Sequence, residues 1–146
     1  MEPIKLIEKY YKKDSLSYKI LITHSKLVTK KALEIANNSS FNPDLKFIKE
    51  AAMLHDIGMF LTKVPLIGCF GEKPYICHIT LGRELLEKEN LPKYALVCER
   101  HTGVGLSIND IEKQGFPLPK RDMIPISIEE EIICLADNFY TKNPKT

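Results

Sequence analysis

Apolar residues recur at three- and four-residue intervals over most of the chain, and this helical period constrains the fold more than any other feature of the sequence. The longest periodic stretch runs from Ser17 to about Asn38. One stripe of it holds Ile20, Leu21, His24, Leu27, Val28, Lys31 and Ala32. Alternating apolar and polar residues, which mark half-buried strands, are nearly absent. The sequence predicts an all-α bundle of six or seven helices without a sheet.

Helix caps and breakers set the limits of the other predicted helices. Asn42-Pro43-Asp44 is typical of a helix start, with Asn42 as the N-cap, proline at the first position and an acid in the first turn. Gly58 is placed to end that helix after His55-Asp56. Ser127 and the glutamate three residues later form a capping box. The predicted helices span about 4–13, 17–38, 42–56, 77–89, 92–100 and 127–140. Loops are predicted over 58–74 and over 103–126, where one short helical turn interrupts a proline-rich stretch.

Composition narrows the class of protein. A chain of 146 residues with 44% hydrophobic and 27% charged residues fits one globular domain, here 1–146, with the motifs between about 17 and 140. The net charge of +2 is too weak to favour a specific nucleic-acid or membrane partner. No run of 18 apolar residues and no signal peptide is present, so we expect a cytoplasmic protein. The oligomeric state stays open.

The four cysteines, Cys69, Cys77, Cys98 and Cys134, form no CxxC pair and are interpreted as reduced thiols of the core. An alternative is that Cys77 and Cys98 join the neighbouring His78 and His101 in a zinc site. Adjacent helical residues point about 100° apart, which disfavours a metal shared by Cys77 and His78.

All four histidines and two acids fall near helix ends or on helix faces that could converge on one site. These residues are His24, His55, Asp56, His78, His101 and Asp137. Taken one at a time, a core histidine is usually only hydrogen-bonded. A buried carboxylate, however, needs a cation or strong donors nearby. Imidazole nitrogen together with carboxylate oxygen suits divalent iron, manganese, nickel or zinc.

The order of these six residues resembles the HD-domain superfamily of metalloproteins. The string LHDIG at 54–58 matches the signature of its HDIG branch, and the successive spacings are 31, 22, 23 and 36 residues. HITLGRELL from His78, RHTGVG around His101 and the late ADNFY resemble small bacterial HD enzymes that hydrolyse diadenosine tetraphosphate. The paired histidines and the GYP element of the cyclic-dinucleotide phosphodiesterases are absent.

This resemblance implies two divalent metal ions per chain, with iron favoured and manganese, nickel, cobalt or zinc as alternatives. The implied ligands of the first ion are His24, His55, Asp56 and Asp137. His78 and His101 would bind the second ion, and Asp56 would bridge both, which makes it the residue on which catalysis depends. Two cations that share a water and orient the resulting hydroxide toward phosphorus would make a phosphohydrolase acting on a small nucleotide or related phosphoester.

Basic residues are needed to hold a phosphate, and Arg83, Lys120 and Arg121 are the candidates. Many HDIG members carry lysine directly after the glycine, whereas this chain has Met59, so Lys63 is a further candidate. The plain alternative is that all four are solvated surface charges. The 103–126 loop is a candidate specificity lid.

Two other functions are compatible with the same ligands. Some two-iron HD proteins are oxygenases that cleave carbon–carbon or carbon–phosphorus bonds with O₂. Other HD-like proteins are non-catalytic signalling domains, usually after losing ligands. The ligands alone do not separate the hydrolase from the oxygenase.

Overall fold

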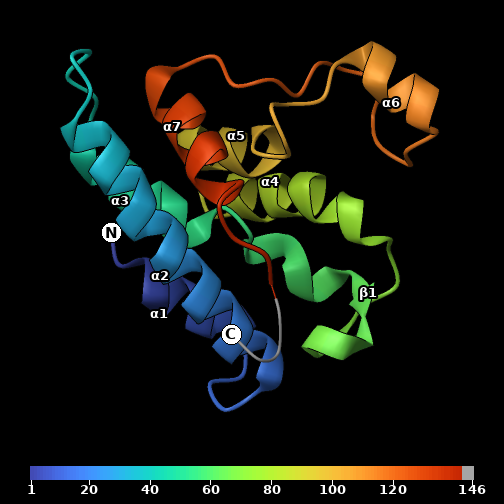
Figure 1. Cartoon of the computed structure of the whole chain (residues 1–146). Helices are drawn as coiled ribbons and strands as arrows, with labels where there is room; N and C mark the ends of the chain where they lie inside the picture. Colours follow the sequence, from blue (N-terminus) through green and yellow to red (C-terminus); the bar gives the residue numbers. More distant parts are fainter. Residues whose placement is uncertain (143–146) are drawn as a thin grey trace.

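Seven α-helices account for most of residues 1–142, the part of the chain that the computed structural model describes (Figure 1). The predicted all-α class is therefore confirmed. The helices are α1 (Pro3–Tyr10), α2 (Leu16–Asn37), α3 (Leu45–Leu54), α4 (His78–Lys88), α5 (Pro92–Arg100), α6 (Ile108–Gln114) and α7 (Ile128–Asp137). None of the helices within these residues combines the length and apolar character needed to cross a bilayer.

The long helix α2 packs against α3 and α7, and α4 packs against α5. The predicted apolar stripe of α2 faces the interior at His24, Val28 and Ala32, but Leu27 stays 38% exposed. Two of the buried apolar clusters contain residues of α2. One contains Leu21 and Leu54, and the other contains Val28. His24 lies between these two parts of α2, so its ring is held inside the bundle.

The start of α3 differs from the prediction. Asp44, rather than Asn42, is the N-cap, and its side chain accepts a hydrogen bond from the Phe47 N–H at 3.0 Å. Asn42 has φ +51°, a left-handed conformation that asparagine tolerates, and it turns the chain into Pro43 ahead of the helix. The acid placed by the prediction inside the first turn therefore acts as the cap.

The predicted absence of a sheet is wrong for a small part of the 58–74 loop. Strands β1 (Lys63–Val64) and β2 (Cys69–Phe70) form an antiparallel hairpin. The 3-10 helix η2 (Pro65–Ile67) connects the two strands, η1 (Ile57–Leu61) precedes β1, and η3 (Tyr75–Cys77) follows β2. Gly68 closes the turn at φ +78°, which glycine adopts without strain. Two-residue strands are too short to show alternation in a sequence.

Gly58 does not end α3, contrary to the prediction, because α3 ends at Leu54. A Cβ on Gly58 would lie 2.4 Å from the His78 carbonyl oxygen and 2.5 Å from the Gly82 nitrogen. The glycine instead allows η1 to touch the backbone of α4. This close approach brings the start of α4 beside the segment that carries His55 and Asp56.

The predicted 103–126 loop is held by more structure than one helical turn. Helix α6 has a capping box formed by Ser107 and Asp110. Leu106 and Met123 exchange backbone hydrogen bonds of 2.9 and 2.7 Å across the base of the loop. Met123 joins an apolar cluster with the start of α4. In Figure 1, α6 lies at the upper right, away from α1 to α3. The capping box predicted at Ser127 is present at the start of α7.

The four cysteines are free thiols and are buried, as expected for core residues. The Cys98 thiol donates to the Leu54 carbonyl, and the Cys134 thiol lies 3.0 Å from the Gly103 carbonyl oxygen. Neither of the residue groups in residues 1–142 that could hold a metal ion includes a cysteine. The alternative zinc site with Cys77 and Cys98 therefore has no support.

Candidate metal centre

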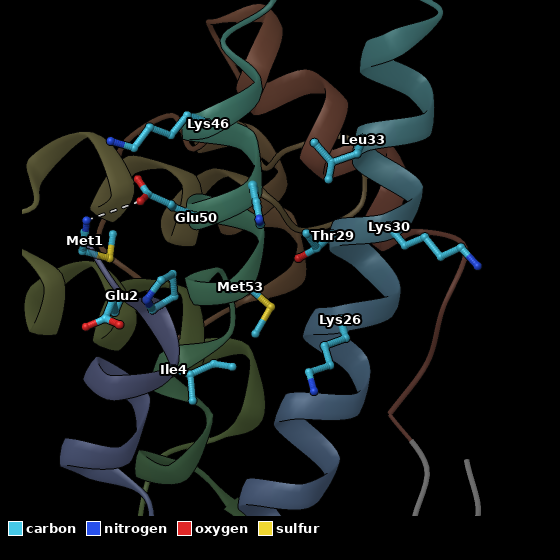
Figure 2. Close-up of a pocket in the computed structure, with 12 residues that line it drawn as sticks. Met1, Glu2, Ile4, Lys26, Thr29, Lys30, Leu33, Lys46, Glu50 and Met53 are labelled. Atoms are coloured by element: carbon cyan, nitrogen blue, oxygen red, sulfur yellow. Dashed lines mark ion pairs between the residues drawn. The ribbon is translucent and has the colours of Figure 1, made fainter.

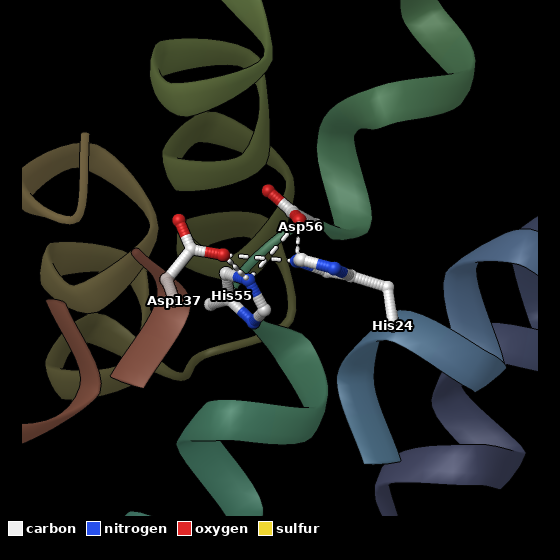
Figure 3. Close-up of side chains that lie close together, drawn as sticks. All are labelled: His24, His55, Asp56 and Asp137. Carbon is white, nitrogen blue, oxygen red and sulfur yellow. Dashed lines mark hydrogen bonds and ion pairs between the residues drawn. The ribbon is translucent and has the colours of Figure 1, made fainter. Parts of the chain in front are cut away.

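The structure brings the six predicted ligand residues together from five parts of the chain. His24 lies within α2, His55 and Asp56 follow α3, His78 begins α4, His101 follows α5 and Asp137 ends α7. They form two groups that could each hold a metal ion, and Asp56 belongs to both. Figure 3 shows the larger group, in which the side chains of His24, His55, Asp56 and Asp137 point toward one another.

Each carboxylate oxygen of Asp56 faces a different pair of histidines. Oδ2 lies 3.2 Å from His24 Nε2 and 3.0 Å from His55 Nε2. Oδ1 lies 3.1 Å from both His78 Nε2 and His101 Nε2. Asp137 Oδ1 completes the larger group at 2.9 Å from His24 Nε2 and 3.2 Å from His55 Nε2. Asp56 thus stands between two separate sets of nitrogen donors.

These spacings fit divalent metal ions. Neighbouring ligands about 2.1 Å from an ion are ~3.0 Å apart around an octahedron and ~3.4 Å apart around a tetrahedron. The nitrogen–oxygen separations in the two groups, between 2.9 and 3.2 Å, are closer to the octahedral value. Both Asp56 oxygens are buried and accept no hydrogen bond of good geometry from residues 1–142, despite the nearby nitrogens. The donor set and the orphaned oxygens fit bound cations.

Three of the histidines have their ring tautomer fixed by the backbone. The Nδ1–H of His55, His78 and His101 donates to the carbonyl oxygen three residues earlier, at 2.6, 2.6 and 2.8 Å. Because Nδ1 carries the proton, the Nε2 lone pair of each ring is directed to the site. The fourth ring differs, since His24 Nδ1 is buried without a hydrogen-bond partner among the described residues.

The electrostatics keep both acids ionised. Burial raises the pKa of Asp56, but the charges of His55 and Lys142 outweigh burial and hold this pKa well below its usual range. Burial likewise raises the pKa of Asp137, and hydrogen bonds from His24 and His55 lower it further than burial raises it. Both side chains are therefore anionic at neutral pH.

His55 and His78 differ in their protonation. Burial lowers the pKa of His55, but the adjacent Asp56 and Asp137 raise it to about 10. Burial lowers the pKa of His78, and Asp56 only partly offsets that effect. A metal ion at the larger group must therefore displace a proton from His55, whereas His78 is neutral and ready to bind.

Lys142 is a residue of this site that the sequence did not reveal. Its ammonium lies 2.8 Å from Asp56 Oδ2 and 5.2 Å from the centre of the Tyr75 ring. The Tyr75 ring in turn stacks on His78, with centroids 4.3 Å apart. Burial lowers the pKa of Lys142, but Asp56 raises it by more. A lysine just beyond a helix normally faces solvent, so no sequence signal separates Lys142 from other lysines.

The predicted phosphate-binding residues lie in other surroundings. Arg83 and Arg121 both pair with Glu99, whose side chain is only 1% exposed. Lys120 and Lys63 are exposed, and Lys63 lies on β1. No described contact joins any of these four residues to the six ligands. Their role in substrate binding stays a prediction.

A cavity of about 740 Å³ lies on another face of the molecule, between the start of α1 and helices α2 and α3 (Figure 2). Its lining is largely apolar, with Met53 and Leu33 among it, and lysines such as Lys26 and Lys49 stand around it. The six ligand residues are not part of this lining.

Helices that converge on a buried histidine and aspartate cluster define a protein with the capacity to bind metal ions. The family model described as HD domain matches residues 21–142, which is most of the chain. The chain belongs to the HD-domain family. The match begins at Leu21, just before His24, and ends at Lys142, so it includes all six ligand residues.

Three relatives align with most of this chain. A tRNA (cytidine(56)-2'-O)-methyltransferase of Picrophilus torridus is 33% identical over 84% of this chain, and its counterpart in Thermoplasma volcanium is 31% identical over 82%. An uncharacterized protein of Methanocaldococcus jannaschii is 32% identical over 84% of the chain and 68% of its own length. The aligned segment spans 32% and 31% of the two methyltransferases. No solved structure gives a significant match.

Proposed function

We propose that this protein is a metal-dependent phosphohydrolase that binds two divalent metal ions and acts on a small nucleotide or a related phosphoester. The observation that carries the proposal is the placement of Asp56. Its two oxygens face separate histidine pairs at 3.0–3.2 Å, as a carboxylate bridging two ions requires. Membership of the HD-domain family supports the hydrolytic class.

His24, His55 and Asp137 would hold one ion, His78 and His101 would hold the other, and Asp56 would bind both. Bound divalent ions lower the pKa of water and neutralise negative charge on a phosphoryl group. The chain's own part is to fix the donors. Backbone carbonyls orient three rings, and the buried acids stay ionised. The low exposure of the six residues limits access of bulk water to the reacting atoms.

A nucleotide substrate is supported by two relatives whose names describe methylation of tRNA. This chain aligns with only about a third of those proteins, so the methyl-transfer activity itself is not carried over. We infer a small substrate that is a phosphate ester of a nucleoside or a related compound. The protein would work on a small molecule in the cytoplasm, without a membrane partner, and iron is the favoured native metal.

The test combines metal analysis with a substrate panel. Protein purified without chelator should contain close to two metal ions per chain. With added manganese or iron it should hydrolyse at least one member of a panel of nucleotides, dinucleoside polyphosphates and phosphorylated RNA ends. Asp56→Asn should lower that rate at least ~1000-fold, because one neutral amide cannot bridge two ions. Asp14→Asn, an exposed acid, is the matched control.

Three results would contradict the proposal. One is a chain that binds no metal, another is full activity in Asp56→Asn, and the third is oxygen uptake with an organic substrate but no phosphate release. The last result would instead identify the di-iron oxygenase class, which uses the same kind of donors. Metal binding without turnover of either kind would favour a non-catalytic role.

A further inference from the structure

Lys142 makes an ion pair that neither the ligand set nor the proposed hydrolysis uses. Its ammonium lies 2.8 Å from Asp56 Oδ2, and its side chain is only 13% exposed. Lysine is rarely buried unless it is paired, so this placement is a specific feature of the site. The same oxygen of Asp56 faces His24 and His55. The ammonium is therefore inside the larger of the two metal-competent groups.

The Lys142 ammonium and a metal ion at the larger group would compete for Asp56 Oδ2. Asp56 Oδ2 lies within 3.2 Å of the His24 and His55 nitrogens, which an ion at the larger group would share with it. A divalent ion beside a lysine ammonium repels it strongly, because the buried site offers little screening by solvent. Metal binding at this group therefore moves the Lys142 ammonium off Asp56.

The displaced ammonium has a short tether. Lys142 lies five positions after Asp137, which is itself a member of the larger group. The lysine therefore stays at the edge of the site, where the phosphoryl group of a substrate would be the nearest free anion. Lysine binds phosphate well as a mobile point charge. The guanidinium groups of Arg83 and Arg121, by contrast, are already paired with Glu99.

We propose that Lys142 is the phosphate-binding residue of this site: its ammonium pairs with Asp56 until metal ions bind, and then binds the phosphoryl oxygens of the substrate. The inference rests on the proposed function, because it assumes a metal centre that acts on a phosphoester. Tyr75 borders Lys142, and its buried hydroxyl has no hydrogen-bond partner among residues 1–142. It offers the same phosphoryl group a second donor.

The experiment measures two binding constants by calorimetry, with manganese and inorganic phosphate as probes, and needs no turnover. In Lys142→Met, manganese should bind the metal-free protein about 10-fold more tightly than in the wild type, since the internal competitor is gone. Phosphate should bind the manganese-loaded variant at least 10-fold more weakly. Lys142→Arg should recover most of the phosphate affinity. Lys88→Met, which removes an exposed lysine at the end of α4, should change neither constant.

Unchanged phosphate affinity in Lys142→Met would overturn the inference and leave the proposed function intact. Weaker manganese binding in that variant would also overturn it, because a lysine that merely supports the ligands would lower metal affinity when removed. A wild-type protein that binds no manganese would overturn both the inference and the proposed metal centre.

Discussion

The carboxylates of Asp56 and Glu99 are both buried, and their charges are neutralised in different ways. The side chains of Asp56 and Glu99 are 0% and 1% exposed. Glu99 is paired with two guanidinium groups, which are always charged, so this cluster is complete as it stands. Asp56 faces four imidazoles that can lose their protons and bind metal. The partners of the two carboxylates, and not their depth of burial, separate the ion-paired Glu99 from Asp56, the proposed metal ligand.

The two clusters share their supporting helices. Helix α4 carries His78 at its start and Arg83 one turn and a half later, and the α5 segment carries Glu99 and then His101. The Glu99 cluster thus fixes the pair of helices that positions His78 and His101. Changes that separate the helices should damage both clusters, whereas changes at one acid should damage only one.

The largest effect on stability is expected from Gly58→Ala. Its Cβ would meet backbone atoms of His78 and Gly82 at 2.4 and 2.5 Å, and backbone cannot move aside as a side chain can. We expect the free energy of unfolding to fall by about 3 kcal/mol, at the upper end for overpacking. The metal content should also fall toward one ion per chain. Urea unfolding and metal analysis measure the two effects.

The matched control is Gly82→Ala, whose Cβ would lie 3.3 Å from the Cys98 side chain and 3.4 Å from the Gly58 nitrogen, the latter an ordinary van der Waals contact. We expect it to cost about 1 kcal/mol and to leave the metal content unchanged. Equal losses in the two alanine variants would show that the approach of η1 to α4 does not position His78.

A smaller loss is expected from Glu99→Gln. Removing one partner of a buried ion pair costs about 3–5 kcal/mol, but the Arg83 and Arg121 side chains are 25% and 45% exposed and can turn to water. We therefore expect a decrease of about 2 kcal/mol in the free energy of unfolding. Metal content and turnover should stay close to wild type. Loss of metal with unchanged stability would contradict the assignment of a structural role to Glu99 and of a metal-binding role to Asp56.

The smallest effect is the pH dependence of the difference in stability between the wild type and Glu99→Gln. Burial raises the pKa of Glu99, but hydrogen bonds from Arg121 and Arg83 outweigh it, so the pKa in the folded protein lies below its usual value. The contribution of Glu99 to stability is therefore complete above about pH 4.3, the usual pKa of glutamate. It is lost as the pH falls through the lower pKa of the folded protein.

The melting temperatures of the wild type and Glu99→Gln, measured from pH 7 down to pH 3, should accordingly converge at the acid end. Metal-free protein is used for both, so that the loss of metal in acid does not contribute. A gap that widens as the pH falls would reverse the sign assigned to Glu99.

The helices were predictable because they depend on local pattern, and the histidine cluster was predictable because the order of its residues resembles that of the HD-domain superfamily. Helix α5 has the predicted bounds, and the capping box at Ser127 lies where its spacing indicates. The order of six ligand residues predicted which side chains would meet. The role of Gly58 was not predictable, because it depends on the distance between η1 and α4 and not on the end of its own helix.

The acids with which the basic residues form ion pairs were also not predictable from the sequence. Arg83, Arg121 and Lys142 are alike in type, yet two pair with Glu99 and one pairs with Asp56. Which acid a long side chain reaches depends on the arrangement of α4, α5 and the segment after α7. No local pattern contains that information.

The hydrogen bonds that lock three of the rings have a consequence for folding. Each of His55, His78 and His101 takes its tautomer from a carbonyl three residues earlier, within its own short segment. A ligand prepared in this way is competent as soon as its helix end forms, before distant helices assemble. When the ends of α3, α4 and α5 come together, the three rings can form most of the proposed metal centre without moving a proton from one ring nitrogen to the other. Only His24, whose Nδ1 has no such partner among the described residues, must obtain its orientation from the assembled bundle.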